Sequence, residues 1–340
     1  MKTKEELELQ YGSLPDTLDI QKVNTLLNKY TNKYKLVDDV KKEVIEFLNV
    51  ENVLFEEGIE TFLNKDGKEQ SINILTIDER LVIIFIDDYT IWNKKNLIKG
   101  TAEKIHFSFV NKGFRVIWIK KFEWENTNKR NVLKSMLLHS INKTKNRFFA
   151  RNTVCECINN SELKDFFDRS SFYGFRSASF AVCLKDKKTG EILQAMSFGH
   201  PYYGKGKYGE NCVECIRSAG KPHTLVVGGM TKLMKFFVQQ YGHTFDTILY
   251  YVDDAHHQND SMDSLGFTFS HFAGGGVHNV WNKTGAMFMR TPALHKEIMF
   301  FQKIEEIYGV PDVGNSVFLF KHINETESVP TEIINILPNE

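Results

Sequence analysis

The sequence predicts an α/β protein with two domains. At 340 residues the chain is longer than one ordinary hydrophobic core requires. Apolar residues make up 42% of it and charged residues 25%, a balance typical of globular proteins. Segments with helical spacing alternate with short runs rich in Ile, Val and Phe, which predict strands. This pattern changes near residue 148, where we place the domain boundary.

The composition also bears on location. The first residues, MKTKEELELQYG, are polar, and no uninterrupted apolar run approaches the ~18 residues of a membrane span. We therefore expect a cytoplasmic protein with no membrane partner, in the host cytoplasm if a phage encodes it. Five cysteines, an odd number, argue against a disulfide framework. The oligomeric state stays open.

The first half contains a helical segment and then several strands. Residues 1–49 form the helical segment, because apolar residues recur three and four apart within 18–49. Residues 54–63 fit either a helix or a strand. Three strands and an amphipathic helix should follow, at 71–77, 81–88, 114–121 and 130–141.

Positive charge is concentrated in one stretch. Residues 94–147 hold 14 Lys or Arg against 3 Asp or Glu, interleaved with Phe and Trp. Such a pattern suits contacts with phosphates and bases, although a solvated helix face is the simpler alternative. We expect DNA to be the partner. The expected contacts are Lys120, Lys121, Lys129, Arg130, Lys143 and Arg147.

The second half has its own sequence of elements. Residues 179–199 predict two strands joined by KDKKTG, a hairpin turn with a glycine. A strand at 210–219 follows, and TLVVGG then leads into a helix that ends near Gly242. Residues 247–254, TILYYVDD, predict another strand, and 326–340 form a tail.

The elements of residues 50–147 resemble a known nuclease family. The strands SINILTIDERLVIIFIDDYTIW and KGFRVIWIKKFEW, followed by the helix RNVLKSMLLHSI, are similar to phage homing endonucleases with a very-short-patch-repair-like catalytic domain. That domain is a branch of the PD-(D/E)XK superfamily. The resemblance implies a small PD-(D/E)XK-like domain at 50–147.

The same resemblance implies that the nuclease site is eroded. Its metal-binding acids correspond here to Asn73 and Ile86, and its histidine corresponds to Asn93. An asparagine offers a hard cation only a neutral amide oxygen. Asp88 matches an aspartate of the repair branch and Asp87 lies beside it, so both are candidate catalytic residues. The alternative is an active nicking endonuclease, in which Asp78, Asp87 and Asp88 hold Mg²⁺ at a displaced site.

Residues 148–325 resemble a second family. The segments EILQAMSFG, ECIRSAGKPHTLVVGGMTKLMKFF, TILYYVDD and DSLGF are similar to the GNAT acyltransferases, and in particular to the GNAT-like domain of those phage proteins and of the Mom DNA-modification protein. In this fold two neighbouring strands splay apart, and backbone amides at the following helix start bind the pyrophosphate of acyl-CoA. The resemblance therefore implies that acyl-CoA is bound by Val227, Gly228, Gly229, Met230 and Thr231.

Several departures from the GNAT pattern point towards a scaffold instead. Leu225 and Met230 replace polar or small residues, and Met262 stands where many acetyltransferases have a general-acid tyrosine. The catalytic candidates are Glu214 and Arg217, which match the related phage domains, and Asp253 at a strand end. The spacing of Glu214 and Arg217 puts them on opposite faces of a strand unless a bulge intervenes.

Three other clusters allow alternatives. The pairs Cys155/Cys157 and Cys212/Cys215 are either reduced core thiols or zinc ligands, and we expect no metal there. The loop 200–211, with three tyrosines and three glycines, either stacks on bases or covers a pocket, or is a plain surface connection. The DDAHH sequence ending at His257 lies at a strand end and could hold a metal or transfer a proton.

The sequence thus favours a DNA-binding protein of phage or mobile-element type, with an eroded nuclease site and a GNAT-like domain. Whether it is an enzyme at all stays open. The alternatives are the nicking endonuclease with a displaced metal site, a Mom-like acyl or DNA-base-modifying transferase, and a protein-interaction module without catalysis.

Overall fold

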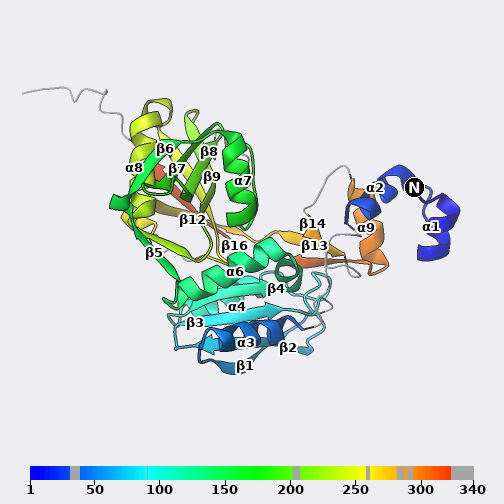
Figure 1. Cartoon of the computed structure of the whole chain (residues 1–340). Helices are drawn as coiled ribbons and strands as arrows, with labels where there is room; N and C mark the ends of the chain where they lie inside the picture. The colour runs from blue at the N-terminus through cyan, green and yellow to red at the C-terminus, as the bar shows by residue number, and fades with distance from the viewer. Residues whose placement is uncertain are drawn as a thin grey trace, which may run out of the picture.

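The predicted α/β fold is confirmed by the computed structural model (Figure 1), which describes residues 1–30, 39–89, 91–201, 207–257, 261–281, 287–288 and 294–322. The expected tail at 326–340 and part of the loop at 200–211 lie outside these residues. A four-stranded and a seven-stranded sheet dominate the chain, and a smaller lobe lies at the end of an arm.

The four-stranded sheet has the order β1-β2-β3-β4. The first three strands run antiparallel, and β4 runs parallel to β3. Every residue of β3 is buried, because helices cover both faces of the sheet. α3 and α6 pack on one face, and α4 packs on the other. The elements are β1 (Glu56–Leu63), β2 (Glu69–Ile77), β3 (Leu81–Ile86), β4 (Arg115–Lys120), α3 (Val40–Val50), α4 (Thr101–Val110), α5 (Lys121–Glu125) and α6 (Thr127–Ser140).

The seven-stranded sheet has the order β12-β16-β11-β9-β8-β7-β6. Its strands β6 to β9 form an antiparallel meander, β11 is parallel to β9, and β16 and β12 complete it in antiparallel fashion. The helices α7 and α8 pack on opposite faces. The elements are β6 (Thr153–Cys157), α7 (Asn160–Ser170), β7 (Phe180–Asp186), β8 (Ile192–Gly199), β9 (Cys212–Gly220), α8 (Gly229–Tyr241), β11 (Thr247–Asp253), β12 (Thr268–Gly274) and β16 (Gly314–Lys321).

Local sequence signals explain parts of this second sheet. The expected hairpin is confirmed as β7 and β8, and Gly190 in its turn has φ 71°, a conformation that glycine adopts without strain. α7 begins at a cap in which the Asn159 side chain accepts hydrogen bonds from the N–H groups of Ser161 and Glu162. α8 lies between β9 and β11 in the chain and supplies the crossover connection that two parallel strands require.

Two short contacts join the sheets. β5 (Asn146–Phe149), where the chain leaves the first domain, pairs in parallel with β10 (Thr224–Val227), which leads into α8. The Trp118 N–H on β4 donates to the Ala255 carbonyl oxygen at 2.8 Å, just after β11. Backbone hydrogen bonds therefore connect the two domains at two places.

The arm is an insertion between β12 and β16. It consists of β13 (Val277–Trp281), β14 (Met287–Phe288), β15 (Ile307–Pro311) and α9 (His295–Lys303). At its far end α9 packs against α1 (Lys4–Tyr11) and α2 (Ile20–Tyr30), well away from both large sheets (Figure 1). In the part of the chain that the structure describes, no helix is long and apolar enough to cross a membrane.

Candidate active site

The strands β9 and β11 separate at their carboxyl ends. They pair only between Cys212–Cys215 and Thr247–Tyr250, so Arg217 and Asp253 lie on the parts that have diverged. The pairing of β9 with β8 shifts at Ile216, which forms a bulge. Because the bulge adds one residue, Glu214 and Arg217 lie on the same face of the sheet. The bulge that Glu214 and Arg217 need in order to share a face is therefore present. The two diverging strands expected of a GNAT-like domain are present as well.

Tyr173 bridges the two diverging strands. It follows α7, and its hydroxyl donates a hydrogen bond to Asp253 Oδ2. The Arg217 guanidinium lies 5.5 Å from the centre of the Tyr173 ring, and Arg217 Nε donates to the Gly174 carbonyl oxygen at 3.0 Å. Although Tyr173 is 45% exposed, burial of its hydroxyl and the Asp253 charge raise its pKa well above the ordinary value. The phenol thus stays protonated at neutral pH.

A buried histidine holds Asp253 from the other side. His256 Nδ1 lies 2.6 Å from Asp253 Oδ2, and His256 Nε2 lies 3.3 Å from Glu123 Oε2 on α5 of the first domain. Burial lowers the pKa of His256, but the charges of Asp253 and Glu123 outweigh it and raise the pKa to about 9. Burial raises the pKa of Asp253, and the His256 charge outweighs that effect, so the pKa is lowered. At neutral pH the pair is charged.

Lys120 continues this chain of charges between the domains. Its Nζ lies 2.6 Å from Asp312 Oδ1 and 3.6 Å from Glu123 Oε1, and its side chain is 1% exposed. His278 Nε2 lies 3.1 Å from Asp312 Oδ2. Burial lowers the pKa of Lys120, but Asp312 and Glu123 outweigh it and raise the pKa. The prediction that Lys120 contacts DNA is therefore wrong, because two carboxylates neutralise its charge inside the protein.

Lys129 also faces the site. Its Nζ lies 4.7 Å from the centre of the Phe172 ring and 6.0 Å from that of Tyr173. Burial lowers the pKa of Lys129, and the nearby Glu123 opposes this shift. The charge pattern predicts Lys129 on a DNA-binding surface, but the residue packs beside Tyr173 at the junction of the domains.

Ser197 adds a polar group next to Arg217. The two residues are register partners on β8 and β9, so both lie on the face that carries Glu214. Ser197 is fully buried, and its hydroxyl has no hydrogen-bond partner among the described residues. An unpaired buried hydroxyl is costly, and at a candidate site it is a ready contact for a bound molecule.

The glycine loop lies at the start of α8. Gly228 has φ 76° and caps the helix, and Val227 ends β10. Gly228 and Thr231 line a pocket of about 530 Å³ together with Cys155, Lys232, Lys235, Phe236 and Gln239. The helix start and two lysines make this pocket suitable for phosphate groups. Met230 points away from it into the core, where its sulfur accepts a hydrogen bond from Ser218 Oγ at 3.4 Å. Met230 therefore does not occupy this pocket.

Gly229 is required for packing. A Cβ on this residue would lie 2.2 Å from Gln194 Oε1 and 3.0 Å from the Val226 side chain. The second glycine therefore lets the start of α8 approach β8 closely. Met262, at the position of the family's tyrosine, is buried in the same core.

The nuclease candidates do not form a metal site. Asp87 and Asp88 follow β3, and the Asn73 Nδ2 lies 3.5 Å from Asp87 Oδ2. On its other side the Lys41 Nζ donates to Asn73 Oδ1 at 3.3 Å. An amide and an ammonium group thus lie next to Asp87. Among the described residues, no group of three or more His, Cys, Asp or Glu could hold a metal ion, which covers Asp78 and the two cysteine pairs as well.

The other expected DNA contacts are spread over several local interactions. Arg130 NH1 lies 3.3 Å from Glu43 Oε2, and Lys143 Nζ donates to main-chain oxygens of Glu51 and Asn52. Arg147 is exposed on β5, and Lys121 is half-buried at the start of α5. DNA binding by these four residues stays a prediction.

Sequence reasoning missed three members of the site. Tyr173 lies in the loop SFYGF, where only its packing reveals it, and Ser197 is one serine in a strand. Asp312 follows β15 of the arm, which the sequence patterns do not predict. By contrast, His256 belongs to the DDAHH sequence that was a candidate for proton transfer, while Glu123 belongs to the KFEW sequence of the first resemblance.

Comparison with known proteins gives structural likeness only. No protein-family model and no curated protein matches the chain. A protein proposed to be a phosphinothricin N-acetyltransferase resembles it at 9% identity and TM-score 0.31, over 51% of this chain and 99% of the other. A proposed acetyltransferase from Salmonella typhimurium, with acetyl-CoA, resembles it at 11% identity and TM-score 0.32, over 52% of this chain and 97% of the other. A proposed streptothricin acetyltransferase from Bacillus anthracis, in complex with acetyl coenzyme A, resembles it at 7% identity and TM-score 0.28, over 50% of this chain and 99% of the other. These scores are too low to support an inference about activity. Any such inference must rest on the residues of the site.

Proposed function

We propose that the chain is a GNAT-type acyltransferase whose active site lies between the diverging ends of β9 and β11. The observation that carries this proposal is the meeting of Arg217, Tyr173 and Asp253 across that opening. The three side chains come from β9, from β11 and from the loop after α7. Burial beside charged partners also shifts the pKa of both Tyr173 and Asp253, as is common at functional sites.

Acyl-CoA fits the glycine loop as the donor. It would supply an activated acyl thioester, and Gly228, Thr231, Lys232 and Lys235 would hold its phosphates. Lys232 is already fixed, because its Nζ donates to the carbonyl oxygens of Ala150 and Thr153. Lys235 is exposed on the next turn of α8 and can turn towards a phosphate.

The protein's own residues suit acyl transfer. Acyl transfer develops negative charge on a carbonyl oxygen, and Arg217 beside the bulge at Ile216 offers positive charge and polar backbone groups there. Tyr173 keeps its proton at neutral pH and can donate it. Asp253, ionised and held by His256, orients the Tyr173 hydroxyl. The acceptor is expected to be an amine, because Glu214 lies on the same face as Arg217 and can attract a cation.

Calorimetry and a transfer assay test this proposal. Acetyl-CoA should bind the wild-type chain with measurable heat at millimolar ligand or below, and Lys235→Glu should weaken that binding about tenfold or more. Arg217→Gln and Tyr173→Phe should leave donor binding within about threefold but lower the rate of acyl transfer 10²-fold or more. Arg169→Gln, an exposed arginine on α7, is the matched control. Absence of binding heat with acetyl-CoA and with longer acyl-CoAs would leave the domain a scaffold.

We further propose that the first domain is related to the very-short-patch-repair-like nucleases and serves to bind DNA without cutting it. Its order of a helix, three antiparallel strands, a helix and a parallel strand supports this relationship. The contact of Lys41 with Asn73 supports the loss of cutting. On this proposal, the whole chain resembles phage proteins that combine such a domain with a Mom-like transferase.

A further inference from the structure

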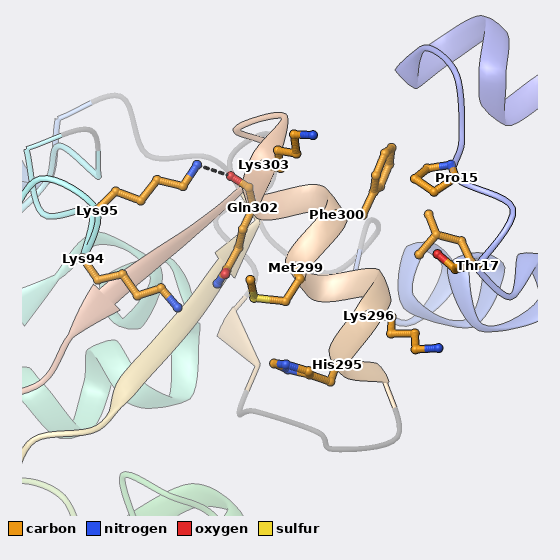
Figure 2. A pocket seen from close by; sticks show the side chains of 11 residues that line it. Pro15, Thr17, Lys94, Lys95, His295, Lys296, Met299, Phe300, Gln302 and Lys303 are labelled. Atoms are coloured by element: carbon orange, nitrogen blue, oxygen red, sulfur yellow. Dashed lines mark hydrogen bonds between the residues drawn. The ribbon is translucent and has the colours of Figure 1, made fainter.

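A basic pocket lies where the arm meets the first domain, far from the glycine loop. Its volume is about 770 Å³. In Figure 2, α9 lies between Lys94 and Lys95 on one side and the turn before α2 on the other. Its lining residues are Pro15, Thr17, Leu18, Lys94, Lys95, His295, Lys296, Met299, Phe300, Gln302 and Lys303.

The charge of this pocket is of one sign. Four lysines and a histidine line it, and no acid does. Glu297, next to Lys296, is buried and faces the Asp19 N–H at 3.4 Å. Asp16, between Pro15 and Thr17, pairs with Lys4 at 2.9 Å. Within the described part of the chain, neither Lys296 nor Lys303 forms an ion pair with a carboxylate. A concave surface with like charges concentrates the field and attracts anions.

The lysines of the loop are held in place by the arm. The Lys94 N–H donates to the Gly309 carbonyl oxygen on β15 at 2.7 Å, and a Cβ on Gly309 would lie 2.8 Å from Lys94 Cδ. The glycine therefore gives room to the Lys94 stem. Lys95 Nζ donates to the Gln302 carbonyl oxygen at 2.5 Å, near the end of α9. Two elements of distant sequence are thus tied together so that their cations face one space.

The remaining lining is apolar. Pro15, Leu18, Met299 and Phe300 form a wall beside the cations, and Met299 is 50% exposed. A purely anionic ligand such as phosphate would not need this wall. A nucleotide unit would use both the lysines and the apolar wall, because its phosphates pair with lysines while its base packs on apolar or aromatic side chains.

We propose that this pocket binds a single-stranded nucleic-acid segment, with phosphates on Lys296 and Lys303 and a base against Met299 and Phe300. An open pocket with cations on both sides suits a strand that passes through it, whereas a duplex keeps its bases stacked and out of reach. The inference is independent of acyltransferase activity, because none of these residues lies at the glycine loop or beside Arg217.

The test compares two variants of equal charge change. Lys296→Glu/Lys303→Glu removes the charge of the pocket, and Lys42→Glu/Lys188→Glu makes the same change at two exposed lysines elsewhere. Fluorescence anisotropy with a labelled 20-nucleotide strand of mixed sequence should show the Kd raised tenfold or more by the first variant and less than twofold by the second. The salt dependence of the first variant should also be shallower, by about 0.7 in log–log slope for each phosphate that its pocket no longer neutralises.

Two further comparisons identify the type of ligand. The single strand should bind more tightly than the matching duplex, and free AMP and ATP should bind at least tenfold more weakly than the strand. Equal losses in the two charge variants, a preference for duplex, or free nucleotides that bind as tightly as the strand would overturn the proposal.

Discussion

Lys120 shows how misleading the charge of a single residue can be. The run of cations between 94 and 147 suggested a surface, yet this lysine is among the most buried side chains of the protein and neutralises Asp312 and Glu123. A charge count along the chain cannot say which side of a strand end faces another domain. Only the packing of β4 against the loop after β11 decides it.

Lys120→Met should therefore destabilise the protein strongly. It leaves Asp312 and Glu123 buried with less compensation, and breaking such a pair costs about 3–5 kcal/mol. Lys121→Met, at the half-buried neighbour, should change the free energy of unfolding by about 0.5 kcal/mol or less. Urea denaturation followed by tryptophan fluorescence measures both. Equal small effects would show that the network contributes nothing.

His256 makes a prediction about pH. Its pKa is about 9 in the folded chain and about 6.5 when unfolded, so folding favours the charged imidazole. The stability it contributes is complete below pH 6.5 and is lost as pH rises through 9. We expect the free energy of unfolding to fall over this window by up to about 3 kcal/mol.

His256→Gln is the control for this titration, since the buried cysteines also titrate at high pH in the unfolded chain. The difference in stability between wild type and variant should shrink as pH rises from 6.5 to 9. A difference that is constant across the window would mean that His256 does not carry the charge assigned to it.

At the level of elements, the glycine loop is a packing device as well as a candidate cradle. Gly229→Ala should lower the free energy of unfolding by about 1–3 kcal/mol, because the new Cβ meets Gln194 and Val226. Gln194→Ala removes the nearer contact, so the destabilisation by Gly229→Ala should be smaller in that background. The four proteins of this double-mutant cycle give the coupling energy from urea denaturation. Additive effects would show that Gln194 does not occupy the space above Gly229.

The sequence predicted individual helices and strands better than it predicted which segments pack or pair with each other. The β7–β8 hairpin and the amphipathic α6 follow from local patterns, because turn glycines and helical periodicity act over few residues. Residues 54–63 were ambiguous, and pairing with β2 makes most of them a strand. The arm was not predicted, since β13 and β15 obtain their stability from contacts 26 or more residues apart that no local pattern encodes. Likewise, Arg217 and Asp253 could be named from motifs, but Tyr173 could not.

For the protein taken as one unit, the first domain should bind without cutting. If the proposed nuclease relationship holds, incubation with duplex DNA and magnesium or manganese should leave the DNA intact, because the amide of Asn73, bound by Lys41, replaces an acid that would hold the metal. Gel electrophoresis after long incubation checks this. Cleavage that disappears in Asp88→Ala would instead establish the displaced metal site.

The pairing of β5 with β10 gives the two domains a mechanical connection. Four register pairs, from Asn146 with Thr224 to Phe149 with Val227, attach the end of the first domain to the strand that enters the glycine loop. A displacement of the first domain should therefore be transmitted through β10 to the backbone at Gly228. Occupancy at one end should consequently be measurable at the other as slower amide hydrogen exchange along β5 when the loop is filled.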